Sequence, residues 1–269
     1  MQRIVTAELD LDLAGSVDLI FSLAVAPQAP VVSEALSFLQ GEHEYSALEI
    51  LDPSGARLHR IQAEPGPLVV RYRAELDGYG VTPPTTSLEP ITYLRPSRYC
   101  QSDEVFGQAR RQFTGLSGHD LVLAITRFVE QSVTYSPGLS LGTDSAVTTL
   151  MTGQGVCRDY AHVVIALLRA MDIPARYAAC YAPGLRPMDF HAVAEAYLDG
   201  AWYVIDATRL ANRHSLVRIA TGRDAADCAF LSFHGANVSM PHLVVNAIVA
   251  DDAEAEIVTD DFTSLVAIA

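Results

Sequence analysis

The 269-residue sequence lacks any apolar run long enough to cross a bilayer, which excludes a membrane-spanning helix. Its most apolar early stretch, residues 19–32, is too short and is interrupted by proline. No positively charged segment followed by an apolar one opens the chain, so we predict no signal peptide. We therefore expect no membrane association.

Basic residues are also scarce. Lys+Arg total 18 against 32 Asp+Glu, which gives a formal net charge of −14. A surface of this sign repels nucleic acids and anionic membranes, so we expect neither as a partner. Half of the residues are hydrophobic and 19% are charged, a composition that indicates a globular protein of one large or two modest domains.

Cysteine is rare as well, and the four present form no CxxC pair and no disulfide framework. We therefore expect free thiols and a reducing, cytoplasmic setting. A lone cysteine is more often a buried packing residue than a reactive group. Cys100, Cys180 and Cys228 have no paired base in the sequence, and we predict that they are buried thiols. Nothing in the sequence calls for a cofactor.

The first third of the chain has the pattern of an all-β domain. Proline- and glycine-containing turns separate strand-like runs at residues 19–26, 45–51, 58–62 and 68–74. A stiff proline-containing connector at residues 81–86 then suggests a domain boundary. We predict a sandwich-like β domain over residues 1–95 and a second domain with C-terminal strands over residues 96–269.

Helical periodicity replaces this pattern after the connector. It predicts helices at residues 117–133, at residues 144–151, and from Cys157 to shortly before Pro174. Three strand-like runs follow, at residues 176–181, 191–198 and 201–207. Helices followed by an antiparallel sheet define an α+β fold.

Cys157 differs from the other cysteines because it begins one of these helices. The free N–H groups and the dipole at a helix N-terminus favour the thiolate, which is the nucleophilic form. The preceding Gly153 and Gly155 leave room for a substrate, and the amides around Cys157 are placed to hold an oxyanion. Gln154 is a weaker candidate for a side-chain oxyanion donor.

A predicted hairpin brings a histidine and an aspartate together. Asp199-Gly200 is a strong two-residue turn signal between two strand-like runs. Counting back from that turn places His191 and Asp206 on one face of the sheet as diagonal cross-strand neighbours. A cysteine, a histidine and an aspartate so placed match the nucleophile, base and orienting group of cysteine acyl-transfer enzymes.

Two other interpretations stay open. One is a metal site of Cys157, His162 and His191, although it lacks a second cysteine ligand at short spacing. Helix geometry turns His162 away from Cys157, so we expect His162 to be structural. The other is a binding module that keeps these residues without a usable cleft.

The segments GVCRDYAHVVIALLRAMDIPARY and DFHAVAEAYLDGAWYVIDAT resemble the core of the transglutaminase-like superfamily, in the branch of bacterial cysteine peptidases. Flanking segments extend the resemblance over residues 93–235. It implies a papain-like or transglutaminase-like core, with helices packed on an antiparallel sheet, after the N-terminal all-β domain. It also implies a catalytic triad of Cys157, His191 and Asp206.

The resemblance further implies thiol-dependent acyl transfer on amide bonds. We predict hydrolysis of a peptide or isopeptide in a peptide or protein substrate, because no feature specifies a site for an acceptor amine. Protein-glutamine transamidation is the alternative. The sequence leaves the oligomeric state open.

Overall fold

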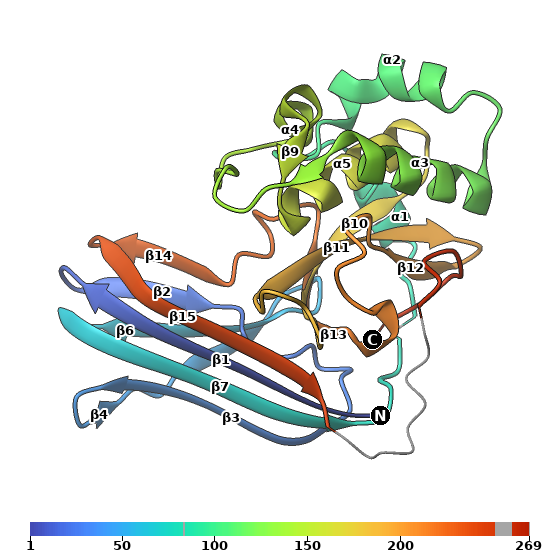
Figure 1. Ribbon diagram of the computed structural model, residues 1–269. Helices are drawn as coiled ribbons and strands as arrows, with labels where there is room; N and C mark the ends of the chain where they lie inside the picture. Colours follow the sequence, from blue (N-terminus) through green and yellow to red (C-terminus); the bar gives the residue numbers. More distant parts are fainter. Residues whose placement is uncertain (83, 251–259, 269) are drawn as a thin grey trace.

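Two antiparallel sheets form a sandwich at one end of the molecule in the computed structural model, which describes residues 1–82, 84–250 and 260–268 (Figure 1). One sheet has the order β15-β1-β7-β3-β4, with bounds Val238–Val249, Gln2–Leu13, Gly66–Asp77, Val31–Gln40 and His43–Glu44. The other has the order β14-β2-β6-β5, with bounds Leu231–Gly235, Val17–Phe21, Arg57–Ala63 and Leu48–Leu51. The predicted all-β character of the N-terminal region is confirmed.

Alternation of apolar and polar residues explains the long strands of the sandwich. In β1, every second residue from Val5 to Leu13 is buried, so one face of the strand turns into the core. Three of the predicted runs correspond to β5, β6 and β7, whereas the run at residues 19–26 is strand only to Phe21. The strands β1 and β3 lie outside the predicted runs.

The C-terminal strands complete this sandwich. β15 pairs with β1, for example Leu9 with Leu243, and β14 pairs with β2. The strands that we predicted as part of residues 96–269 are therefore hydrogen-bonded to the sheets of the N-terminal region. The boundary near residue 95 stays a prediction, but the first structural unit is closed by strands from both ends of the sequence.

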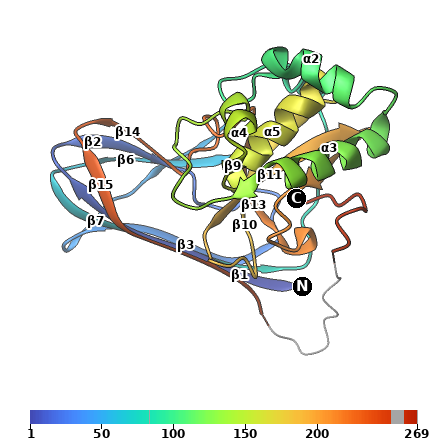
Figure 2. The same cartoon turned by 45° about the horizontal axis from the view of Figure 1, so that its top comes forward.

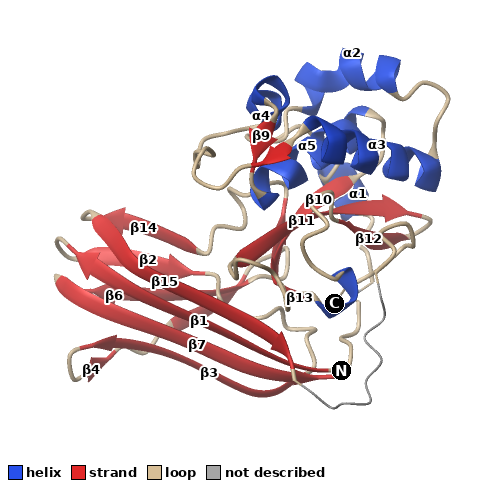
Figure 3. Ribbon diagram, viewed as in Figure 1, coloured by secondary structure: helices blue, strands red, loops and turns tan. Residues whose placement is uncertain are grey.

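Helices and a smaller sheet form the other end of the molecule (Figure 3). The helices are α1 to α5, at Leu88–Thr92, Ser102–Gln112, Gly118–Ser132, Ala146–Thr152 and Cys157–Ala170. The sheet has the antiparallel order β12-β11-β10-β13, at Ala201–Ile205, Phe190–Leu198, Ala175–Tyr181 and Val217–Gly222. Two short strands, β8 (Thr134–Tyr135) and β9 (Gln154–Gly155), pair in parallel, and a 3-10 turn spans Arg213–Ser215. The predicted α+β class and the helices α3, α4 and α5 are confirmed.

Helix α5 lies at the centre of this half. It packs against α2, α3, α4 and strands β10 and β11 of the sheet, and Figure 2 shows it between α4 and α3. Every residue from Asp159 to Ala170 is buried, so the helix is covered on all sides rather than along one stripe. Only its first turn, where Cys157 lies, is partly open to solvent.

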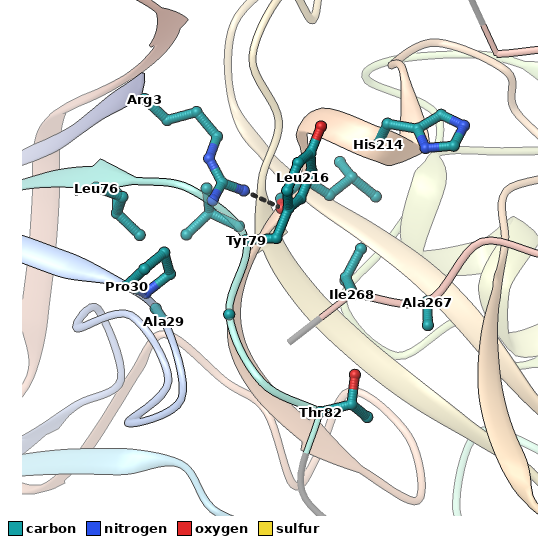
Figure 4. A pocket seen from close by; sticks show the side chains of 12 residues that line it. Arg3, Ala29, Pro30, Leu76, Tyr79, Thr82, His214, Leu216, Ala267 and Ile268 are labelled. Atoms are coloured by element: carbon teal, nitrogen blue, oxygen red, sulfur yellow. Dashed lines mark hydrogen bonds between the residues drawn. The ribbon is translucent and has the colours of Figure 1, made fainter. Parts of the chain in front are cut away.

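The two ends of the molecule share one continuous core. The Tyr181 hydroxyl in β10 donates to the Leu23 carbonyl at 2.9 Å, and the Tyr181 ring stacks on Tyr72 of β7. Arg3 in β1 donates to the Leu216 carbonyl at 3.1 Å, beside a small cavity that Tyr79 and Ile268 also line (Figure 4). The sandwich therefore supports the smaller sheet directly.

A buried ion cluster joins β10, β11 and β13. Glu195 is fully buried and accepts from Arg176 at 2.7 Å and from Arg218 at 2.6 and 2.7 Å. Burial alone would raise the pKa of Glu195, but the two guanidinium groups lower it to about 2. Arg176 also stacks on Trp202 and bonds to Glu89 of α1. One carboxylate thus holds three strands in register.

We predict that Glu195→Gln destabilises the protein by roughly 3–5 kcal/mol, because it leaves buried Arg218 without its counter-charge and Arg176 with Glu89 alone. Urea unfolding followed by circular dichroism measures the change. The matched control is Glu49→Gln, which removes a half-exposed partner of Arg57 and should cost no more than about 1 kcal/mol. An equal loss of unfolding free energy in Glu195→Gln and Glu49→Gln would contradict the stabilising role of the buried ion cluster.

Candidate active site

The start of α5 is fixed by the side chain of Asp159. The backbone N–H of Val156 donates to Asp159 Oδ2 at 2.8 Å, so a carboxylate in the first turn caps the helix. Asp159 is 1% exposed, and a Cβ added to Gly155 would lie 2.6 Å from its Cβ. Only glycine at position 155 allows this close approach, which places Cys157 at the first helical position.

A loop between β8 and α4 is held against the same turn. Arg158 donates to the Ser140 hydroxyl at 2.6 Å and to the Leu141 carbonyl at 2.7 Å, and it pairs with Asp159 at 2.9 Å. Ser140 in turn donates to Asp159 at 2.6 Å. Arg158 and Asp159 are therefore ion-pairing and capping groups that also fix one side of the site.

The hairpin brings His191 and Asp206 into contact. β11 and β12 pair in the predicted register, with Leu198 opposite Ala201 and Ala194 opposite Ile205. His191 lies near the start of β11, and Asp206 follows the last residue of β12. His191 Nε2 lies 2.8 Å from Asp206 Oδ2, and both side chains are buried.

Asp206 is itself held in place by Thr208. Its Oδ1 accepts from the Thr208 backbone at 2.9 Å and from the Thr208 hydroxyl at 2.7 Å. Burial by itself would raise the pKa of Asp206, but the interaction with His191 and these bonds lower it. Thr208 is the last residue of the segment DFHAVAEAYLDGAWYVIDAT, but no pattern in that segment indicates this role.

His191 faces Cys157 as well as Asp206. Burial lowers the pKa of the imidazole, but the attraction and hydrogen bond of Asp206, together with the nearby Cys157 thiol, outweigh it and raise the pKa to about 10. Within the described residues, His191 Nδ1 has no hydrogen-bond partner. Because Nε2 is bonded to Asp206, Nδ1 is the ring nitrogen left for an interaction with the partly exposed Cys157.

His162 stands apart from these residues. Its ring is fully buried between Tyr99 and Tyr177, and its Nε2 accepts from the Ala225 backbone at 3.2 Å. Burial lowers the pKa of His162 to about 3, so it is a neutral acceptor that holds the segment after β13. Across the part of the chain that the structure describes, no three His, Cys, Asp or Glu side chains are grouped to hold a metal ion.

The other residues considered from the sequence lie in the core or in a paired strand, away from the contacts described above. Cys100, Cys180 and Cys228 are buried, and burial raises the pKa of each thiol, to about 12 for Cys100. Gln154 lies in β9 opposite Thr134 of β8. Tyr135, the neighbour of Thr134, lies beside Cys157, a position that no pattern in the sequence indicated.

The chain is similar to known proteins over this region. Residues 109–207, which contain Cys157, His191 and Asp206, match the family model of the transglutaminase-like superfamily. The crystal structure of a proposed cysteine protease from Cytophaga hutchinsonii shares 35% identity with a TM-score of 0.85, over 93% of this chain and 91% of that one. An uncharacterized protein of Mycobacterium leprae is 28% identical over 116 residues, which are 40% of this chain and 42% of that protein.

The similarity to the Cytophaga protein extends over nearly the whole of both chains, and on this basis the protein belongs to the transglutaminase-like superfamily. Membership supports a thiol-dependent activity. The chain matches less than half the length of the Mycobacterium relative. None of the helices in the described ranges is long and apolar enough to cross a membrane.

We predict that Asp206→Asn lowers the pKa of His191 by more than about one unit, because burial of the imidazole remains while the attracting charge is lost. Imidazole ¹⁵N chemical shifts recorded against pH would measure this.

The raised pKa also implies that protonated His191 contributes stability fully below about pH 6.5, a contribution lost as the pH rises through about 10. The difference in the free energy of unfolding between the parent protein and Asp206→Asn should therefore shrink as the pH rises towards 10. A pH-independent difference would contradict this assignment.

We also predict that Gly155→Ala lowers the free energy of unfolding by roughly 1–3 kcal/mol, because the new Cβ overlaps Asp159 and disturbs the cap of α5. Chemical denaturation tests it. In the control, Gly107→Ala in α2, the new Cβ would meet nothing nearer than Arg111 at 3.5 Å, and stability should stay equal or rise. A tolerated Gly155→Ala would show that the cap does not need this close approach.

Proposed function

We propose that the protein is a cysteine amidase that hydrolyses a peptide or isopeptide bond through Cys157, His191 and Asp206. The observation that carries the proposal is the histidine bonded to a buried aspartate through Nε2, with Nδ1 unpaired beside a partly exposed cysteine. The cysteine begins a long buried helix, whose N-terminal dipole favours a thiolate. This arrangement supplies a nucleophile, a base and an orienting group.

In the acylation step, the thiol proton of Cys157 resides on His191, and the thiolate sulfur attacks the amide carbonyl carbon. A C–S bond forms while the carbonyl electron pair moves onto oxygen, which the Cys157 backbone N–H stabilises. Imidazolium then donates its proton to the leaving nitrogen, and the C–N bond breaks. The products are an amine and a thioester on Cys157.

In the second step, neutral His191 takes a proton from water, and the resulting hydroxide attacks the thioester. The acid is released and the thiolate–imidazolium pair is restored. An amine in place of water would give transamidation, which is the alternative function. The sequence contains no lysine, so self-cross-linking through lysine is not open to this chain.

A peptide-like substrate is supported by the loop that flanks the first turn of α5. Arg158 holds this loop at Ser140 and Leu141, and its side chains Leu139 and Leu141 are 62% and 66% exposed. Apolar side chains exposed beside a nucleophile are suited to bind the side chains of an extended peptide. We therefore propose that this loop contacts the substrate.

We predict that Cys157→Ala reduces hydrolysis of p-nitrophenyl acetate and of fluorescein-labelled casein by more than about 1000-fold, since the acyl-enzyme cannot form. Cys100→Ala, which removes a buried thiol, should retain activity. Incorporation of a dansylated amine into casein would measure transamidation in parallel. Unchanged hydrolysis by Cys157→Ala would overturn the proposal, and amine incorporation faster than hydrolysis would favour the alternative.

A further inference from the structure

Asp206 is covered by a segment that lies far from it in the sequence. The Val204 N–H, two residues before Asp206, donates to the Val266 carbonyl at 2.7 Å, so residues 260–268 run beside β12 at the edge of the smaller sheet (Figure 1). Residues 262–265 and helix α3 line a cavity of about 10 Å³ together with Asp206. A cavity of this size holds about one water molecule at most. Asp206 is therefore enclosed between α3 and this segment.

A buried cation lies next to the enclosed aspartate. Arg213, in the 3-10 turn after β12, lines the same cavity and donates from Nη1 to the Val204 carbonyl at 3.0 Å. Both Arg213 and Asp206 are 3% exposed. Charges that water does not screen attract one another strongly, so an unpaired guanidinium here would draw Asp206 towards itself. Arg213 without a partner of its own would thus compete with His191 for Asp206.

Asp260 is the partner of Arg213. Its Oδ2 accepts from the Arg213 backbone N–H at 2.9 Å and from Nε at 2.8 Å, and its Oδ1 accepts from Nη2 at 2.7 Å. The Phe262 N–H also donates to Oδ1 at 2.8 Å, and the Phe262 ring lies 5.4 Å from the guanidinium. Burial raises the pKa of Asp260, but these hydrogen bonds outweigh it and lower the pKa. The carboxylate is therefore charged at neutral pH and matches the charge of Arg213.

Other cationic groups near Asp206 are placed differently. Besides Arg213, the basic residue that lines the cavity, among the residues that the structure describes, is His119 of α3. Arg209, three residues after Asp206, pairs with Glu130 at 2.7 Å, and its side chain is 38% exposed, where solvent screens the charge. Arg213 is thus the permanently charged group that lies buried beside the aspartate.

We propose that Asp260 is a positioning residue for the triad: it neutralises Arg213 and so leaves Asp206 to His191. The effect on turnover rests on the proposed function, whereas the effect on the imidazole does not. Asp260 touches neither Cys157 nor the substrate and transfers no proton. It acts through Asp206, because the charge that would otherwise attract Asp206 is already paired.

Asp260→Asn tests this role, because it keeps the shape of the side chain and removes its charge. We expect Asp206 to turn towards Arg213, which weakens its bond to His191 and lowers the pKa of His191 by more than about one unit. Acylation by p-nitrophenyl acetate should slow roughly 10- to 100-fold, since the imidazole is no longer held in place. Imidazole ¹⁵N chemical shifts against pH and stopped-flow release of p-nitrophenol measure the two effects.

Arg213→Gln combined with Asp260→Asn separates charge from packing, because it removes both charges and keeps polar side chains. In this double variant the pKa of His191 should return to within about half a unit of the parent value, and acylation should be faster than in Asp260→Asn alone. The matched control is Asp261→Asn, which removes the charge of the next residue, whose side chain is exposed. Its His191 pKa and its acylation rate should equal those of the parent protein.

An unchanged His191 pKa in Asp260→Asn would overturn the inference. A lowered pKa that the double variant does not restore would also overturn it, since residues 260–268 would then act only as a cover. If Asp260→Asn does not fold, a double variant that folds with the parent pKa supports the inference, and one that also fails to fold contradicts it. A parent protein whose His191 titrates as expected but that is never acylated would overturn the proposed function alone.

Discussion

The buried hydrogen bond between His191 Nε2 and Asp206 Oδ2 is the interaction on which the site depends. It orients the imidazole so that Nδ1 is left for Cys157. It also stabilises the protonated, positively charged form of His191 in a buried position that water does not solvate. Such a charge is stable only with a paired counter-charge. The hairpin register and the bonds from Thr208 serve to hold that counter-charge in place.

The rest of the fold positions this pair against the start of α5. The helix is buried on all sides from Asp159 onward, so its N-terminus has little freedom to shift. Asp159 and Arg158 fix its first turn, and Glu195 fixes the sheet below the histidine. The β-sandwich contributes through the shared core around Tyr181. Together these contacts hold the Cys157 thiol and the His191 imidazole at fixed positions relative to one another.

The parts that the sequence predicts well are those set by local pattern. Apolar periodicity identifies α3 and α5, and the Asp199-Gly200 turn fixes the register that joins His191 to Asp206. Long-range pairing is different, because β14 and β15 join strands more than 200 residues away and nothing local specifies that partner. Tyr135 was missed for a related reason. A two-residue strand carries no periodicity, so only the folded chain brings it to Cys157.

The central claim is that one of four cysteines is set apart by its surroundings. Cys100, Cys180 and Cys228 are buried with raised thiol pKa values, whereas Cys157 is partly exposed beside His191. The most direct measurement is the rate of iodoacetamide alkylation at each cysteine of the native protein near pH 7, read by peptide mass spectrometry. We predict that Cys157 reacts at least about 100-fold faster than the other three. A Cys157 that reacts no faster than the buried thiols would contradict the account.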